Sequence, residues 1–207
     1  MTLCLVTDRR SRPVVEQCRE AVRAGVDIIQ VRERDLDGGP LASLVAELVQ
    51  LTRGTATRVV VNDRLDVALA SGADGVHLRG DSIPPASARA IVPPGFLIGR
   101  SVRREDEAKA VEASVDYLIA GTVFPTPSKA GLTEWLGLEG LTRICRAVAV
   151  PVLAIGGLTP DRLGGVAAAG AAGAAAIGLF AGEDRPLADV VGAARDAWAR
   201  PNYGLTP

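Results

Sequence analysis

Short runs of β-branched and other apolar residues recur along the chain, and segments with the spacing of amphipathic helices separate them. Eight apolar runs begin near Leu3, Ile28, Arg58, Gly75, Phe96, Tyr117, Val152 and Ala174. Helices are predicted at residues 14–24, 40–52, 65–71, 83–90, 104–113, 138–148, 160–169 and 186–199. Unbroken apolar runs, such as the valines at positions 59–61, favour strands that are buried on both faces, as in a parallel sheet.

Strands that alternate with helices indicate βα units. Eight such units in 207 residues predict an α/β fold, namely a single (β/α)8 TIM barrel over residues 1–207 with its site at the C-terminal ends of the strands. An open doubly wound sheet is the alternative, but no GxGxxG motif follows the first strand, which weakens it. No linker or composition break divides the chain.

Composition narrows the class of protein. Hydrophobic residues make up 48% of the chain and the net charge is -1, which argues against disorder and against a nucleic-acid partner held by a basic face. Three well-separated cysteines and one histidine predict neither a disulfide framework nor a zinc site. The N-terminus does not resemble a signal peptide, and the uncharged stretch 163–182 is too rich in Ala and Gly for a membrane helix. We therefore expect a cytoplasmic protein without a membrane partner.

Polar residues gather where the predicted strands end, as a barrel enzyme requires. They are the segment 30–35 after the second strand, Asn62, Asp63 and Arg64 after the third, His77 and Ser101 at the ends of the fourth and fifth, the segment 122–129 after the sixth, Gly156 and Gly157 after the seventh, and Gly178 after the eighth.

The glycines after the seventh and eighth strands indicate a phosphate site. Gly156 and Gly157 precede a helix that Thr159 can cap, and Gly178 follows the next strand. Backbone amides of these two loops often bind phosphate in such barrels. The alternative is that the glycines only form tight turns.

Three cations are predicted at the same rim. Arg32 and Arg34 follow the second strand, and Lys129 lies in a loop of Pro, Thr and Ser, where its ammonium group can bind a phosphate. A solvated loop lysine is the alternative for Lys129.

Two further residues have both a chemical and a structural interpretation. Asp63 can hold Mg²⁺ with substrate phosphates, or it can cap the helix from Leu65 or pair with Arg64. His77 can serve in acid–base chemistry or hydrogen bonding at the barrel mouth, or be purely structural. No GxSxG motif or cysteine–histidine pair supports nucleophilic catalysis. The residues alone thus predict a barrel that binds a phosphate or diphosphate ester.

In order and spacing, several motifs resemble those of the thiamine phosphate synthases and their relatives, the thiazole tautomerases. They are LVTD at 5–8, QVRERD at 30–35, NDRLDVA at 62–68, GADGVHL at 72–78, FPTPSK at 124–129 and AIGG at 154–157. The resemblance implies the coupling of a hydroxymethylpyrimidine diphosphate to a thiazole phosphate with release of pyrophosphate. The implied mechanism is dissociative, and Mg²⁺ and cations stabilise the departing charge.

The resemblance also implies roles for individual residues. The residues implied to bind the pyrimidine diphosphate are Gln30, Arg32, Asn62, Ser101 and Lys129, among which Arg32 and Lys129 are the expected catalytic cations. Arg34 is a further implied substrate-binding residue. Asp63 is the implied Mg²⁺ ligand and His77 lines the pyrimidine pocket. The thiazole phosphate falls to Thr126, Ser128, Gly157, Ile177 and Gly178.

The chain departs from the synthase pattern at several positions. Ser82 stands where the family has a second Mg²⁺ carboxylate, Arg34 replaces a lysine, and Gly178 replaces a serine. These departures favour the tautomerase branch, but Thr122 replaces the histidine of that branch and Gln30 fits the synthases. A synthase is the leading hypothesis. A tautomerase-like isomerase and a non-catalytic thiamine phosphate binder are the alternatives, and a homo-oligomer is compatible with each.

Overall fold

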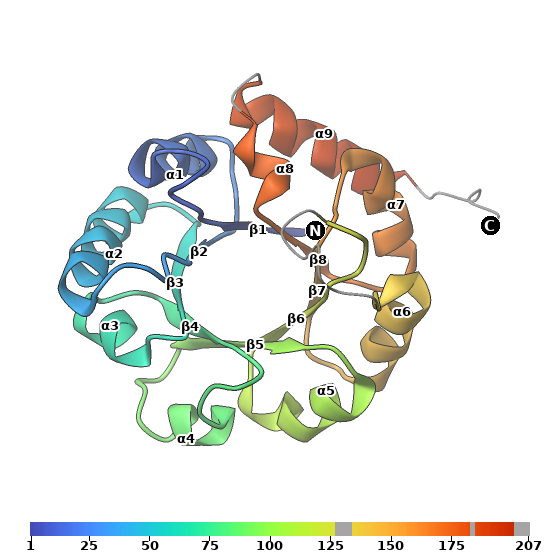
Figure 1. Cartoon of the computed structure of the whole chain (residues 1–207), viewed down its shortest axis with the longest axis horizontal. Helices are drawn as coiled ribbons and strands as arrows, with labels where there is room; N and C mark the ends of the chain where they lie inside the picture. The colour runs from blue at the N-terminus through green and yellow to red at the C-terminus, as the bar shows by residue number, and fades with distance from the viewer. Residues whose placement is uncertain (127–133, 183–184, 201–207) are drawn as a thin grey trace.

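A ring of eight parallel strands lies inside a ring of helices (Figure 1). The computed structural model describes residues 1–126, 134–182 and 185–200. The strands are β1 (Thr2–Val6), β2 (Ile28–Val31), β3 (Arg58–Asn62), β4 (Gly75–Leu78), β5 (Leu97–Val102), β6 (Tyr117–Gly121), β7 (Val152–Ile155) and β8 (Gly173–Ala176). They pair in chain order, and β1 also pairs with β8. This closure confirms the (β/α)8 barrel and rules out the open doubly wound sheet.

Helices follow every strand, as the hydrophobic periodicity predicts. They are α1 (Val14–Arg23), α2 (Gly38–Thr52), α3 (Leu65–Ala70), α4 (Pro85–Arg89), α5 (Glu105–Val111) with a 3₁₀ turn (Glu112–Ser114), α6 (Gly137–Ala147), α7 (Pro160–Ala168), α8 (Gly178–Ala181) and α9 (Leu187–Ala199). The fourth helix begins at Pro85 rather than at residue 83, because a residue before proline disfavours the helical conformation. The short helix α8 was not predicted from the sequence.

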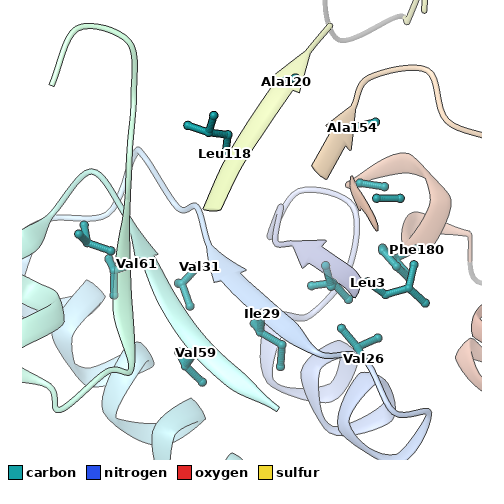
Figure 2. Packing of buried hydrophobic residues seen from close by; sticks show 14 of the residues in the cluster. Leu3, Val26, Ile29, Val31, Val59, Val61, Leu118, Ala120, Ala154 and Phe180 are labelled. Carbon is teal, nitrogen blue, oxygen red and sulfur yellow. The ribbon is translucent and has the colours of Figure 1, made fainter. Parts of the chain in front are cut away.

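Alternation along each strand divides the apolar side chains into two layers. Outward-facing residues such as Leu3, Ile29 and Val59 pack against the helices (Figure 2). Inward-facing residues such as Cys4 and Val60 fill the barrel interior. Parallel strands that are covered on both faces account for the unbroken apolar runs in the sequence. Among the described helices, none has both the length and the hydropathy to cross a membrane.

Candidate active site at the mouth of the barrel

Four of the predicted residues form a polar layer inside the barrel. Gln30, Asn62, His77 and Ser101 lie at or near the carboxyl ends of β2 to β5. Asn62 and His77 are register partners in neighbouring strands, and the Gln30 amide donates from Nε2 to Asn62 Oδ1 over 3.2 Å. Above the apolar interior, the barrel therefore carries hydrogen-bonding groups at the end where function resides in this fold.

The Gln30 side chain is almost completely buried, at 3% exposure, yet its Oε1 atom has no hydrogen-bond partner among the described residues. An unsatisfied buried acceptor costs about 1–3 kcal/mol. Such a group is tolerated at a binding site because an incoming ligand can satisfy it. The Gln30 Oε1 atom is thus the acceptor in the polar layer that a hydrogen-bond donor of a ligand can satisfy.

His77 lies in the middle of a chain of three polar side chains. Its Nε2 is 2.8 Å from Ser101 Oγ, and its Nδ1 is 3.3 Å from Tyr117 Oη. Burial, and then the charge of Arg100, lowers the pKa of His77 from 6.5 to about 3. The imidazole is therefore neutral at physiological pH, and it suits hydrogen bonding better than proton transfer.

Gly99 makes room for this chain. A Cβ atom at position 99 would lie 2.5 Å from Tyr117 Oη and 2.6 Å from His77 Nδ1, far inside van der Waals contact. The glycine of β5 is therefore required by the two rings on the neighbouring strands β4 and β6.

Asp63 neither caps the helix that begins at Leu65 nor pairs with Arg64. Its backbone has a φ of 66°, the left-handed region that Asp tolerates better than most residues, and Arg64 rather than Asp63 precedes α3 as the capping residue. Arg64 pairs with Asp66 instead. The helix-cap and Arg64-pair alternatives for Asp63 are therefore wrong.

The Asp63 carboxylate is engaged by the loop that follows β4. It accepts hydrogen bonds from the Ser82 hydroxyl and, at Oδ2, from Arg79 Nη1 over 3.4 Å. Arg79 also reaches Asp81, at 2.5 Å. Asp63 thus lies in contact with Ser82, which stands where the sequence resemblance implies a second carboxylate.

The loops after β1 and β2 position Arg32. Thr7 Oγ1 donates to the buried Glu33 carboxylate over 2.5 Å and accepts from the Arg32 amide over 3.0 Å. Desolvation lowers the pKa of Arg32, and the charges of Arg34 and then Arg79 lower it further against the opposing effect of nearby carboxylates. Arg34 itself is exposed. Arg32 therefore lies in the electrostatic field of two further guanidinium groups, those of Arg34 and Arg79.

The loops after β6 and β7 pack closely together. Gly156 and Gly157 have φ values of 102° and 64°, and a Cβ at Gly157 would lie 2.5 Å from the Pro125 carbonyl oxygen. Arg162 stacks over Phe124 at 4.8 Å and donates to the Gly157 carbonyl over 2.6 Å. The two glycines are thus required for the close approach of these loops, whatever they bind.

At β8, Ile177 precedes α8, and Gly178 is exposed, with open space within 4 Å of the position that a Cβ atom would take. Thr126 is the last described residue of the loop after β6. Ser128 and Lys129 lie outside the described residues, so their predicted roles stay predictions.

Sequence reasoning missed three residues of this site. Tyr117 begins a strand, and Gly99 lies within one, so neither stands at the end of a predicted strand. Arg79 does follow a strand, and its charge directly after the motif that contains His77 was the signal that could have identified it.

The geometry first defines the class of protein, an α/β barrel with neutral hydrogen-bonding groups in its mouth and arginines in the loops at the same end. A sequence profile described as thiamine monophosphate synthase matches residues 3–180. The chain belongs to the thiamine monophosphate synthase family, and it is a transferase of thiamine biosynthesis.

Individual relatives agree with this assignment. The thiamine-phosphate synthase of Methanoculleus marisnigri is 42% identical over 93% of this chain and 92% of its own. That of Moorella thermoacetica is 41% identical over 89% and 86%. The solved thiamine phosphate pyrophosphorylase of Pyrococcus furiosus is 37% identical, covers 95% of each chain and superposes with a TM-score of 0.85. A 3-hexulose-6-phosphate synthase, at 20% identity and a TM-score of 0.72, shares the fold.

Proposed function

We propose that the barrel mouth couples hydroxymethylpyrimidine diphosphate to thiazole phosphate and releases pyrophosphate. The observation that carries this assignment is the buried Gln30 amide, which is bonded to Asn62 and keeps one oxygen without a partner among the described residues. A heteroaromatic ring with N–H donors and ring-nitrogen acceptors satisfies such a pair of amides. The neutral His77 and its hydrogen-bond partner Ser101 lie in the same polar layer.

In a dissociative coupling reaction, cations stabilise the negative charge of the leaving group. The bond between the pyrimidine methylene carbon and the diphosphate oxygen breaks, and its electron pair leaves with pyrophosphate. The thiazole nitrogen then donates its lone pair to the carbocation to form the new C–N bond. Arg32, Arg34 and Lys129 stabilise the departing negative charge, and the apolar interior below keeps water from the cation.

The donor set at Asp63 fits Mg²⁺ with a single protein carboxylate. Mg²⁺ is usually held by one or two carboxylates together with substrate phosphates and water. No cluster of three or more His, Cys, Asp or Glu side chains that could hold a metal occurs in the described part of the chain. Asp63 would therefore hold the ion together with the diphosphate, where its chemistry is to neutralise charge on the leaving group.

The thiazole phosphate is assigned to the loops after β6, β7 and β8. Thr126, Ser128, Gly157, Ile177 and Gly178 come from these three loops, and Arg162 holds the first two loops together. A cytoplasmic location and a homo-oligomer complete the proposal. The three free cysteines suit a reducing compartment, and size-exclusion chromatography with light scattering measures the oligomeric state.

One assay tests the function. Purified protein is mixed with both substrates, with and without Mg²⁺, and thiamine phosphate is measured as its fluorescent oxidation product. We expect Mg²⁺-dependent product, and a Gln30→Met variant with a raised KM for the pyrimidine diphosphate. Thr57 is buried directly before β3, where its hydroxyl donates to the Val26 carbonyl, so Thr57→Val is a control for stability loss alone.

The alternatives are distinguished by the same samples. Folded protein that makes no product from good substrates contradicts the proposal. Isomerisation of the thiazole phosphate would then identify a tautomerase, although Thr122 packs against Gly156 and offers no imidazole for that reaction. Tight thiamine phosphate binding without turnover would identify a binding protein.

A further inference from the structure

We propose that Arg79 binds the diphosphate of the substrate and competes with Mg²⁺ for the Asp63 carboxylate. In the free protein the guanidinium is held by Asp63 and Asp81, and it moves to the diphosphate when that anion arrives. This inference rests on the proposed function, because it assigns a further residue to the same diphosphate.

Position is the first argument. Arg79 directly follows β4, the strand that ends with His77 and Leu78, so its backbone lies at the rim of the polar layer. Its Nη1 is 3.4 Å from Asp63 Oδ2, and its Nη2 is 2.5 Å from Asp81 Oδ2. The Arg79 side chain is 37% exposed and the Asp81 side chain 70%, so both can rearrange without disturbing the core.

Charge is the second argument. Desolvation and then the charge of Arg34 account for most of the lowered pKa of Arg32, and Arg79 adds to it. Arg32 and Arg79 both follow the carboxyl ends of strands, β2 and β4, at the same rim. An anion that lies between two guanidinium groups is attracted by both of them. A planar guanidinium also matches two oxygens of a phosphate group at once.

The loop that carries Arg79 is held in a defined shape. Arg100 donates to the carbonyl oxygens of Gly80 (2.9 Å) and Ile83 (3.3 Å), and the Arg79 amide donates to Ser82 Oγ over 2.7 Å. With the backbone fixed, only the Arg79 side chain needs to move between the carboxylates and the diphosphate.

The third argument concerns Ser82, which contacts the same carboxylate as Arg79. The serine hydroxyl bonds to Asp63 and brings no negative charge, so Asp63 alone supplies the charge of this pair. Arg79 supplies a permanent positive charge beside it. A guanidinium paired with Asp63 must leave before a metal ion can use that carboxylate. The diphosphate draws Arg79 away from Asp63 and so makes the carboxylate available to the ion.

The test uses binding rather than turnover. Isothermal titration calorimetry of the full chain measures the affinity for inorganic pyrophosphate in the presence of EDTA. A separate titration measures the affinity for Mg²⁺ alone. In EDTA, Arg79→Ala should weaken pyrophosphate binding about tenfold or more, since it removes a hydrogen bond between two charged groups. The same variant should bind Mg²⁺ more tightly than the wild type, because its competitor is gone. The pyrophosphate affinity of Arg79→Lys should lie between those of the wild type and Arg79→Ala.

Arg58→Ala is the matched control. Arg58 and Asp74 form an ion pair between β3 and β4 at 2.9 Å, at the amino ends of the two strands that carry Asp63 and Arg79 at their carboxyl ends. This variant should leave both affinities unchanged. Circular dichroism confirms that each variant is folded.

Two results would overturn the proposal: an Arg79→Ala variant that binds pyrophosphate as the wild type does, or one whose Mg²⁺ affinity is unchanged or weaker. Failure of the proposed function is a separate result. The wild-type protein could make no thiamine phosphate while Arg79→Ala still changes the pyrophosphate and Mg²⁺ affinities as expected. That result would contradict the coupling reaction and support the Arg79 site.

Discussion

His77 Nε2 lies 2.8 Å from Ser101 Oγ, which joins the carboxyl ends of β4 and β5 inside the barrel. On the other side of the ring, Tyr117 Oη is 3.3 Å from Nδ1. Both partners are hydroxyls, which can donate or accept, so either tautomer of the neutral ring is satisfied. The imidazole therefore needs no charge to hold its place.

Because the buried His77 imidazole is neutral, we expect the free energy of unfolding to fall as the pH is lowered. The pKa of His77 is about 3 in the folded protein and 6.5 as the reference value, so the unfolded chain binds the proton first as pH falls. The stabilisation is present above pH 6.5 and is lost as pH falls toward 3. Between pH 7 and pH 5 the loss is about 2 kcal/mol, at about 1.4 kcal/mol per unit.

Urea denaturation at pH 7 and pH 5 measures this effect. His77→Gln keeps hydrogen-bonding groups but cannot titrate, so its free energy of unfolding should change by about 2 kcal/mol less than that of the wild type over this interval. Equal pH dependence of the two proteins would show that His77 is not a buried neutral group.

Gly99→Ala should destabilise the protein, because the added methyl group collides with the Tyr117 and His77 rings. Overpacking of this kind costs about 1–3 kcal/mol. Gly192→Ala is the control. Gly192 lies in α9 with no atom within 4 Å of its Cβ position, so alanine there should be neutral or stabilising by about 0.5–1 kcal/mol. Similar unfolding midpoints for both variants would contradict the packing around Gly99.

Lys129→Ala should lower the coupling rate about 10²- to 10³-fold, because one group that stabilises developing charge contributes roughly that much. The other lysine of the chain, Lys109, provides the control. It is exposed on α5 and pairs with Glu105 at 2.6 Å, so Lys109→Ala should couple at the wild-type rate. Steady-state kinetics at saturating substrates compares them, and a wild-type rate for Lys129→Ala would refute this role.

Ser82→Asp should raise the affinity for Mg²⁺, because it places a second carboxylate against Asp63. Without the ion the two negative charges repel, so the melting temperature of this variant should become dependent on Mg²⁺. Ser82→Asn adds similar bulk without charge and should show neither effect. If calorimetry finds the same Mg²⁺ affinity in Ser82→Asp and the wild type, residue 82 does not reach the ion.

Local pattern was sufficient to predict the barrel and the edge at which its site lies. Apolar runs of strand length between amphipathic segments require a parallel sheet covered on both faces, and polar residues at strand ends mark its carboxyl edge. The sequence therefore identified Gln30, Asn62, His77 and Ser101, which the structure places in one layer. The helix α8 escaped prediction because four residues carry too little periodicity.

The partners of these residues could not be predicted, because they depend on the register and tilt of a closed sheet. Asp63 bonds to Arg79 and Ser82, 16 and 19 positions away, rather than to the adjacent Arg64. Tyr117 at the start of β6 reaches His77, 40 positions away, because staggered strands bring different levels of the chain together inside the barrel. By itself, the sequence determined the alternation of strands and helices and the edge of the barrel at which the polar residues gather, through local periodicity. Only the tertiary structure decided which of them touch, through the closure of the sheet.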